Sequence, residues 1–238
     1  MSVKNSYNTI SKKFSQTRNH PWPEFEEFLK YLPKNAKVLD VGCGNGRLLD
    51  FLKKQEEYDM SYTGIDFSEG LLSEARKKHP HEKFISMDMR DMDKKLGGKF
   101  DAIFAIASFH HLELYEERMQ VLESFRAHLR PGGKIFMTNW NLFQKKYLKY
   151  IFASMVHCIF NKIDSRLRGN DRDWNDVFIP FNNNGDITQR YYHAFTPFEL
   201  KELFQKSAFK VVDSFSYNKL KRVKFWWQGR NLCCVLKK

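Results

Sequence analysis

The chain has 238 residues, 42% of them hydrophobic and 16% aromatic, which suits a single α/β domain with additions. No apolar run reaches the ~18–20 residues of a membrane-spanning helix, and the N-terminus lacks the apolar segment of a signal peptide, so we expect a cytoplasmic protein without a membrane partner. A formal charge of +12 favours polyphosphate partners such as RNA, although a generally basic surface explains it equally well.

Residues 1–32 precede the first expected strand and are predicted to cap the mouth of a ligand site. The segment Pro21-Trp22-Pro23 ends any earlier helix, because proline cannot continue one. Residues 24–32 carry apolar side chains at helical spacing and therefore predict an amphipathic helix. Trp22 either faces the site or packs on the core, whereas no packing reason accounts for Arg18.

A glycine-rich turn, Asp40-x-Gly42-x-Gly44-x-Gly46, links an expected strand at residues 37–41 to an expected helix at residues 46–54. Glycines let the backbone approach a ligand closely, but this turn lacks the full G-x-G-x-x-G of dinucleotide-binding sites. Asp40 stands at the carboxyl end of its strand, where a carboxylate suits a cationic or amine-bearing ligand better than a pyrophosphate. An ordinary turn in an α/β domain is the alternative.

Two more acids end the next two expected strands. Asp66 ends the strand at residues 61–66 and follows Gly44 by 22 residues, the separation at which a carboxylate reaches ribose hydroxyls in a βαβ unit. Ser68 is predicted to cap the helix that follows. Asp88-Met89 ends the strand at residues 83–87 and is predicted to hold an adenine by its amino group and its face, unless Asp88 serves as a helix cap or turn residue.

His110 and His111 follow an apolar run at residues 100–107 that predicts a buried central strand. Adjacent residues rarely point at one ion, and the four cysteines have no metal-ligand spacing, so no metal site is expected. One of the two histidines is expected to pack beneath the helix predicted at residues 113–129.

The α/β rhythm stops after a fifth strand at residues 134–138. Residues 143–176 are basic and aromatic and are predicted to shape the mouth of the site, with residues 147–163 as a docked helix rather than a membrane anchor. The chain then returns to regular elements: a helix at residues 198–206 capped by Thr196-Pro197, a strand at 210–215, a basic aromatic loop at 222–227 and a last strand at 231–236.

These motifs together resemble those of class I S-adenosylmethionine (SAM) methyltransferases. The matching motifs are the turn at residues 40–46, Gly64-Ile65-Asp66, Asp88-Met89, Ile106-Ala107 and Leu129-Arg130-Pro131-Gly132-Gly133. Five further segments resemble the family that methylates 5-carboxymethyluridine at the wobble position of tRNA. They are Phe14-x-x-Thr17-Arg18-x-x-Pro21-Trp22-Pro23, Ala105-Ile106-Ala107-x-x-His110-His111-Leu112, Trp140, residues 176–180 and Arg190-Tyr191-Tyr192-His193-x-Phe195.

The resemblance covers nearly the whole chain and departs from the family at residues 143–172 and 219–228. It implies an α/β, Rossmann-like sheet of seven strands, mostly parallel with an antiparallel last strand and with helices on both faces. The whole chain, residues 1–238, would form one methyltransferase domain. Residues 1–32 would be its cap and residues 143–195 an insertion on the substrate side.

The resemblance also implies SAM as the cofactor and S-adenosylhomocysteine as the product. The cofactor-binding residues that it implies are Tyr7, Arg18, Asp40, Gly42, Cys43, Gly44, Asp66, Phe67, Asp88, Met89 and Ala105. The substrate-side residues that it implies are Trp22, His110, Trp140, Arg190, Tyr191 and His193. The expected partners are tRNA and, as in some relatives, a small zinc-binding activator protein; no DNA is expected.

The implied acceptor is a carboxylate that is already anionic, so no general base is proposed. Arg18 and Arg190 are the candidates for positioning it, because guanidinium grips carboxylates bidentately, although a structural salt bridge would also explain Arg190. Tyr191, Tyr192 and His193 are candidates for stacking on a base, with one tyrosine expected in the core by alternation. Two rival functions are a methyltransferase for a quinone, fatty acid or other metabolite, and a SAM- or RNA-binding protein without catalysis.

Overall fold

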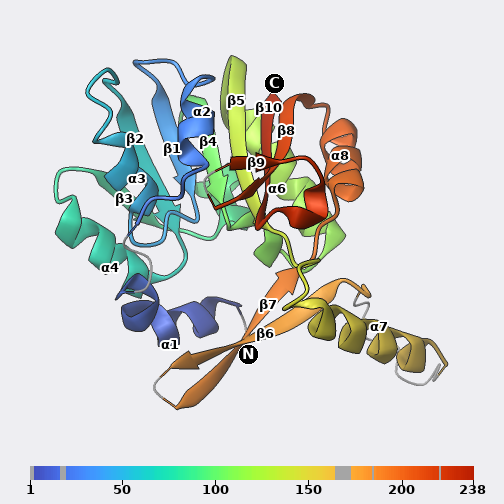
Figure 1. Ribbon diagram of the computed structural model, residues 1–238. Helices are drawn as coiled ribbons and strands as arrows, with labels where there is room; N and C mark the ends of the chain where they lie inside the picture. Colours follow the sequence, from blue (N-terminus) through green and yellow to red (C-terminus); the bar gives the residue numbers. More distant parts are fainter. Residues whose placement is uncertain (1–2, 17–19, 164–172, 184, 220) are drawn as a thin grey trace.

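The computed structural model describes residues 3–16, 20–163, 173–183, 185–219 and 221–238 (Figure 1). Within these residues eight strands form a central sheet in the order β3-β2-β1-β4-β5-β10-β8-β9. Neighbouring strands from β3 to β5 are parallel, and β10 is antiparallel to both β5 and β8. The strands are β1 Lys37–Val41, β2 Ser61–Asp66, β3 Lys83–Ser86, β4 Phe100–Ile106, β5 Leu129–Trp140, β8 Lys210–Asn218, β9 Lys221–Val223 and β10 Asn231–Lys237.

This sheet confirms the expected Rossmann-like arrangement with an antiparallel last strand, but it has eight strands instead of seven among the described residues. The additional strand is β9, which pairs antiparallel with β8 at the sheet edge. It occupies part of the segment that the sequence indicates as a basic aromatic loop. The chain turns back after Asn218 and adds three residues to the edge before the short 3-10 turn Trp226–Gln228.

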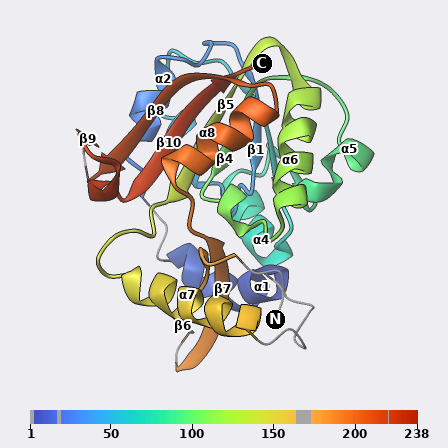
Figure 2. The same cartoon turned by 90° about the vertical axis from the view of Figure 1, so that its right-hand side faces the viewer.

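Helices cover both faces of the sheet. Helices α2 and α3 pack on one face through a cluster that includes Phe25, Phe28 and Phe51, and α5, α6 and α8 pack on the other face around Phe125 and Phe204. Figure 2 shows α6 and α8 side by side on the face opposite α2. The helices of this layer structure are α2 Phe25–Leu29, α3 Arg47–Leu52, α4 Glu69–Lys78, α5 Met92–Lys95, α6 Tyr115–His128 and α8 Pro197–Lys206.

A second group of elements lies beside the carboxyl ends of the parallel strands. It consists of α1 Val3–Gln16, α7 Leu148–Ile163 and the hairpin of β6 Asp176–Asn183 and β7 Asp186–His193. Figures 1 and 2 both place these four elements together at one end of the molecule. The Ser6 hydroxyl donates a hydrogen bond to the carbonyl of Gln189 over 3.1 Å, which ties α1 to β7. The leader and the late insertion therefore meet over one edge of the sheet.

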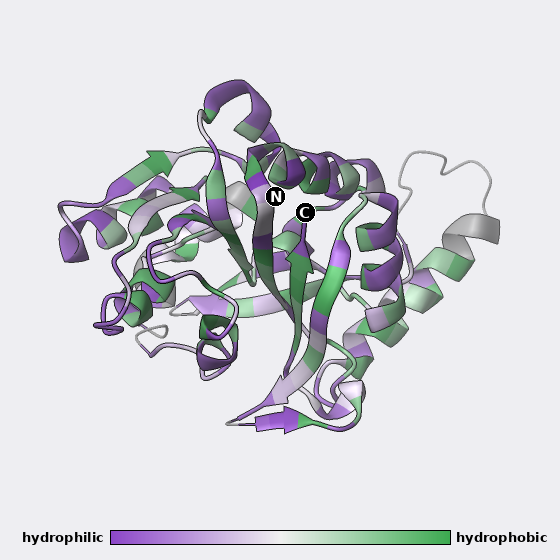
Figure 3. Ribbon diagram, turned by 90° about the horizontal axis from the view of Figure 1, so that it is seen from above, coloured by the Kyte–Doolittle hydropathy of each residue, from purple (hydrophilic) through white to green (hydrophobic). Residues whose placement is uncertain are grey.

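Helix α7 docks by one side only, as its apolar sequence predicts. Ile151 is buried, and the Ser154 hydroxyl donates to the carbonyl of Asp176 over 2.7 Å. Four apolar side chains of this helix are exposed: Leu148, Phe152, Met155 and Ile159. Figure 3 shows hydrophobic segments in green along the helix. Among the described residues, no helix is both long enough and apolar enough to cross a membrane.

The strands expected at residues 37–41 and 61–66 are confirmed residue for residue. Strand β5 begins at Leu129, five residues before the expected start, because Leu129 pairs with Phe100 across an irregularity in the ladder. The sequence does not predict helix α1, because its residues are largely polar. Its apolar side chains Tyr7 and Ile10 are buried against Leu71 of α4.

Candidate active site

The glycine turn after β1 has the backbone that its sequence predicts. Gly42, Gly44 and Gly46 have φ values of 75°, 56° and 78°, in the left-handed region that favours glycine. A Cβ atom at Gly42 would lie 2.4 Å from the Cβ of Ser108, so only glycine fits between the turn and the end of β4. The turn thus brings two strand ends into contact and forms the floor of a pocket.

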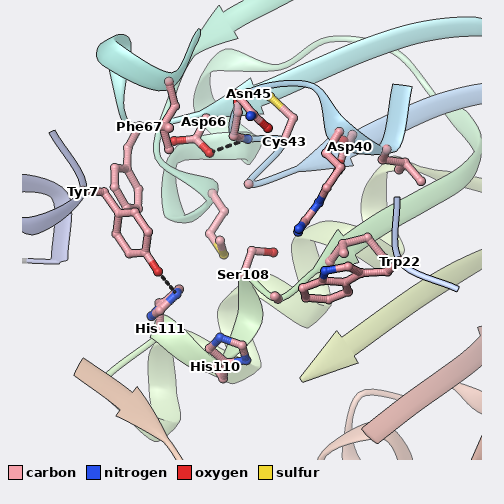
Figure 4. Close-up of a pocket in the computed structure, with 18 of the residues that line it drawn as sticks. Tyr7, Trp22, Asp40, Cys43, Asn45, Asp66, Phe67, Ser108, His110 and His111 are labelled. Atoms are coloured by element: carbon pink, nitrogen blue, oxygen red, sulfur yellow. Dashed lines mark hydrogen bonds between the residues drawn. The ribbon is translucent and has the colours of Figure 1, made fainter. Parts of the chain in front are cut away.

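This pocket opens at the carboxyl ends of β1, β2 and β4, where doubly wound sheets bind their ligands. Figure 4 shows Tyr7 and His111 on one side of it and Trp22 on the other, with Asp66 and Ser108 between them. Its lining is contributed by the leader, the sheet, the loop after β4 and the insertion: Tyr7, Trp22, Phe25, Asp40, Gly42, Cys43, Gly44, Asn45, Arg47, Leu48, Asp66, Phe67, Leu71, Met89, Ile106, Ala107, Ser108, His110, His111, Trp140 and Tyr192.

Asp66 is held in place by the backbone around it. Its carboxylate accepts hydrogen bonds from the N–H groups of Gly44 and Ser68, over 2.9 and 2.8 Å. Burial raises its pKa to about 6, so the group is ionised at neutral pH. A fixed carboxylate at the end of the second strand can accept hydrogen bonds from two neighbouring hydroxyl groups of a ligand.

Asp40 carries a buried oxygen that lacks a partner. Its Oδ2 accepts a hydrogen bond from the Tyr62 hydroxyl over 2.7 Å, whereas Oδ1 has no donor among the described residues. The side chain is 1% exposed and lines the pocket. Burial raises its pKa to about 7, because the charged form is poorly solvated there. A cationic ligand group would complete the environment of this carboxylate.

Two histidines form the wall beneath the leader. The Tyr7 hydroxyl donates to Nε2 of His111 over 2.9 Å, and Nδ1–H of His111 donates to the carbonyl of Tyr191 over 2.8 Å. Nδ1 of His110 accepts from the backbone N–H of Trp140 over 3.2 Å. Burial lowers the pKa of His111 to about 4 and that of His110 well below its usual value, so both rings are neutral at pH 7. Both line the pocket, which corrects the expectation that one packs beneath α6.

Arg190 lies beside this wall, and no carboxylate of the described residues forms an ion pair with it. The residue is 4% exposed, and its Nε and Nη1 have no hydrogen-bond acceptor among the residues described by the structure. Its guanidinium lies 5.3 Å from the ring of Tyr192, 5.0 Å from that of Phe181 and 5.7 Å from that of Trp140. The rings of Trp140 and Tyr192 are stacked, with centroids 5.1 Å apart. A buried guanidinium with free donors fits an anionic ligand group.

Tyr191 and His193 are not at the pocket, and their expected role as substrate residues is corrected. Residues alternate along β7, so Tyr192 shares a face with Arg190 while Tyr191 and His193 point the other way. The Tyr191 hydroxyl donates to Asp176 over 2.6 Å, and His193 bonds Asp176 and Glu199 over 2.6 Å each. Burial acts to lower the pKa of His193, but the hydrogen bonds to these two carboxylates outweigh it and the pKa is raised.

The other expected residues divide into three groups. Those that line the pocket are Tyr7, Trp22, Asp40, Gly42, Cys43, Gly44, Asp66, Phe67, Met89, His110 and Trp140. Asp88 and Ala105 do not line it, because Asp88 caps the 3-10 turn Met89–Asp91 and pairs with Arg90, and Ala105 is buried within β4. Arg18 lies outside the described residues.

Tyr192, a candidate for stacking on a base, also lines the pocket. Four polar lining residues were not predicted from the sequence, although each lies in or next to a recognised motif: Asn45, Arg47, Ser108 and His111. Arg47 stands where the dinucleotide pattern G-x-G-x-x-G has its third glycine. Its guanidinium lies 4.3 Å from the centroid of the Trp22 ring. Its position directly after the glycine turn could have predicted that Arg47 lines the pocket.

The strand order and the glycine turn define a Rossmann-like cofactor-binding domain, and comparison with known proteins narrows this class. Residues 39–135 match the family described as a methyltransferase domain. The tRNA (carboxymethyluridine(34)-5-O)-methyltransferase ALKBH8 of Mus musculus is 35% identical over 149 residues, which are 60% of this chain and 21% of the mouse protein. The tRNA (carboxymethyluridine(34)-5-O)-methyltransferase of Saccharomyces cerevisiae is 36% identical over 154 residues, 65% of this chain and 53% of the yeast protein.

This chain thus spans only part of those two relatives. A protein of Encephalitozoon cuniculi that is named as a methyltransferase is 30% identical over 208 residues, which cover 87% of this chain and 86% of that protein. The crystal structure of a SAM-dependent methyltransferase from Methanosarcina mazei has the same fold, with a TM-score of 0.66, 16% identity and coverage of 89% and 96%. The chain belongs to the class I SAM-dependent methyltransferases.

The pocket fits SAM on two observations of its own residues. The unpartnered oxygen of Asp40 suits the α-ammonium of the cofactor's methionine part, and the fixed carboxylate of Asp66 suits the two ribose hydroxyls. The left-handed glycines leave room for the ligand above the turn. Because Asp88 is engaged by Arg90, the prediction that it holds the adenine remains a prediction.

The raised pKa of Asp40 predicts how SAM binding depends on pH. Only the ionised carboxylate attracts the ammonium, so SAM affinity should rise as pH rises through about 7. Between pH 6.0 and 7.5 the ionised fraction of Asp40 grows about eightfold and that of Asp66 about twofold, so calorimetry should show a combined gain in affinity of about sixteenfold. Asp40→Asn should bind SAM more weakly and keep only about a twofold change, which comes from Asp66 with its pKa of about 6. A change in Asp40→Asn as large as that of the wild type would place the titrating group elsewhere.

Proposed function

We propose that this methyltransferase transfers the methyl group of SAM to the carboxylate of 5-carboxymethyluridine at the wobble position of tRNA. The observation that carries this proposal is Arg190, a buried guanidinium next to the stacked rings of Trp140 and Tyr192, whose Nε and Nη1 have no acceptor among the described residues. A planar cation beside aromatic rings matches a pyrimidine that bears a carboxylate. The names of the mouse and yeast relatives support the same substrate.

The reaction needs little acid–base chemistry. Bound SAM supplies a methyl group on a positively charged sulfur, an electrophile that a carboxylate oxygen can attack in line. The new C–O bond forms as the S–CH₃ bond breaks, the sulfonium becomes a thioether, and no proton moves. The lowered pKa values of His110 and His111 agree with this, since they make both rings weak bases.

The chain contributes by holding the two reactants in register. Asp40 and Asp66 fix the methionine and ribose parts of the cofactor on one side of the pocket. Arg190 holds one carboxylate oxygen of the substrate and leaves the other free to attack, while Tyr192 and Trp140 flank the uracil ring. Catalysis then rests on orientation and on excluding water from the carboxylate.

We further propose tRNA as the partner, in the cytoplasm, and a small zinc-binding activator protein as an accessory. The direct test is methylation of an anticodon stem-loop containing 5-carboxymethyluridine with labelled SAM, with and without such an activator. Nucleoside mass spectrometry of tRNA from a deletion strain should show 5-carboxymethyluridine accumulating at the expense of its methyl ester. A stem-loop that stays unmethylated under both conditions contradicts the proposal and favours a metabolite as the acceptor.

Binding to tRNA should depend steeply on salt, because the chain carries a formal charge of +12. Lys and Arg that pair with phosphates release counterions, and the logarithm of the affinity falls linearly with that of the salt concentration. Filter binding should therefore show at least about a tenfold loss over a fourfold rise in salt. A flat salt series, with methylation of a small metabolite, would overturn the assignment of tRNA.

A further inference from the structure

A second groove adjoins the reaction pocket and shares three residues with it: Trp22, Arg47 and Trp140. Figure 4 shows Trp22 on the side of the pocket away from Tyr7, so the groove lies beyond that wall. The remaining lining comes from the leader, the segment before α7 and the turns around β8 and β10: His20, Pro21, Pro23, Glu24, Gln144, Lys146, Tyr147, Tyr217, Lys219, Arg230 and Asn231.

The groove is strongly cationic. Arg47, Lys146, Lys219 and Arg230 line it, although they are far apart in the sequence. The lysines and Arg230 are exposed, and no carboxylate forms an ion pair with any of these three among the described residues. Arg222 shows the contrast, because Glu27 and Asp213 pair with it and it lies outside the groove.

The one acid in the lining does not cancel this charge. Glu24 is buried, and its carboxyl accepts a hydrogen bond from the side-chain amide of Asn231. Burial raises its pKa, and this single carboxyl faces four cations in the lining. The electrostatic environment therefore attracts anions.

A run of aromatic rings leads from the reaction pocket into this groove. Tyr192 stacks on Trp140 with centroids 5.1 Å apart, and Trp140 stacks on Tyr147 with centroids 6.3 Å apart. Tyr192 belongs to the pocket, Tyr147 belongs to the groove, and Trp140 to both. Alternating aromatic faces and cations are what a single-stranded nucleic acid requires, since bases stack and phosphates pair.

We propose that this groove, with Lys146, Lys219 and Arg230 at its rim, binds the phosphates of the nucleotides that flank the methylated uridine. The inference rests on the proposed function, because it takes the reaction pocket as the site of that uridine. An acidic protein would also be attracted to the charge, but it would not explain the aromatic run that continues into the pocket. The groove thus distinguishes an anticodon loop from a free nucleoside.

The test uses the full chain with its activator and two charge-matched variants. Lys146→Ala/Lys219→Ala/Arg230→Ala removes the rim cations, and Lys54→Ala/Lys210→Ala/Lys237→Ala removes three exposed lysines outside both cavities. The probes are a carboxymethyluridine-containing anticodon stem-loop and the free nucleoside 5-carboxymethyluridine. For the rim variant we expect stem-loop binding weaker by about tenfold or more and a salt slope shallower by about 2, while kcat/KM for the free nucleoside is unchanged.

The two levels of the proposal fail in distinguishable ways. If the wild-type protein methylates neither probe, the proposed function fails. If it methylates the stem-loop and the rim variant matches the control variant in affinity and salt slope, the groove is not the phosphate site. If the rim variant also loses SAM binding or melts at a lower temperature than the control, each single substitution is measured, and a loss confined to unstable variants overturns the inference.

Discussion

Arg190→Lys is expected to lower kcat/KM for the carboxymethyluridine stem-loop by about tenfold or more, which is roughly 1.4 kcal/mol of transition-state stabilisation. Lysine keeps the charge but cannot present two coplanar N–H donors to one carboxylate oxygen. Arg190→Met, which removes the charge at similar length, should lower it by about a hundredfold, near the upper range for a hydrogen bond to a charged group. SAM affinity should change little, since Arg190 is not among the residues that line the pocket and lies beside it, next to Tyr192 and Trp140.

The loss should appear mainly in KM. The carboxylate gives up its negative charge as the ester forms, so Arg190 binds the ground state at least as well as the transition state. The charge of the substrate carboxylate allows a second measurement. The wild-type protein should bind the stem-loop with the free acid more tightly than the stem-loop with the methyl ester, and Arg190→Met should bind the two equally. Equal preference in wild type and variant would assign Arg190 a purely structural role.

Arg118 supplies the matched control for this experiment. It is 1% exposed, like Arg190 a buried arginine, but it donates to the carbonyls of Leu112 and Glu113 and lies 3.7 Å from Asp176. Its hydrogen bond to the Tyr191 hydroxyl and its ion pair with Asp176 hold α6 against the hairpin. Arg118→Lys should therefore lower the melting temperature without altering the preference for acid over ester.

Sequence reasoning was most successful where a motif fixes the backbone. The spacing of Asp40, Gly42 and Asp66 was enough to predict two strand ends meeting at one pocket, because the parallel βαβ geometry leaves few alternatives. It was least successful for β7. Alternation along a strand requires one of Tyr191 and Tyr192 to face away, but only the packing of Asp176, Glu199 and Arg118 decides which one.

The missed contribution of His111 has a similar cause. A pair of adjacent histidines gave no direction to either ring, and helix α1 was not expected from its polar sequence. Once α1 lies over the pocket, Tyr7 selects His111 as its partner, and the hairpin supplies the second hydrogen bond through the carbonyl of Tyr191. The tautomer of the His111 ring thus depends on tertiary contacts with two segments far away in the sequence, α1 and the hairpin, and local sequence patterns do not reveal such contacts.

Asp66→Ala is expected to weaken SAM binding by roughly 1.5–3 kcal/mol, or about 10- to 150-fold, since it removes an acceptor for the two ribose hydroxyls in a buried site. The same side chain also anchors the backbone at Gly44 and Ser68, so a loss of affinity alone does not prove contact with the ribose. Asp101→Ala is the matched control, because Asp101 likewise accepts a backbone N–H, from Lys37 over 2.8 Å, and pairs with Arg130 outside the pocket.

Comparing S-adenosylhomocysteine with its 2′-deoxy analogue separates the two roles of Asp66. Wild-type protein and Asp101→Ala should both bind the deoxy analogue less tightly than S-adenosylhomocysteine, because the analogue lacks one of the two hydroxyls that donate to the Asp66 carboxylate. Asp66→Ala should bind the two ligands alike, since the hydroxyl has then already lost its acceptor. If Asp66→Ala keeps the full discrimination, or if its SAM affinity by calorimetry equals that of Asp101→Ala, the ribose is held by another residue and Asp66 serves only to fix the turn.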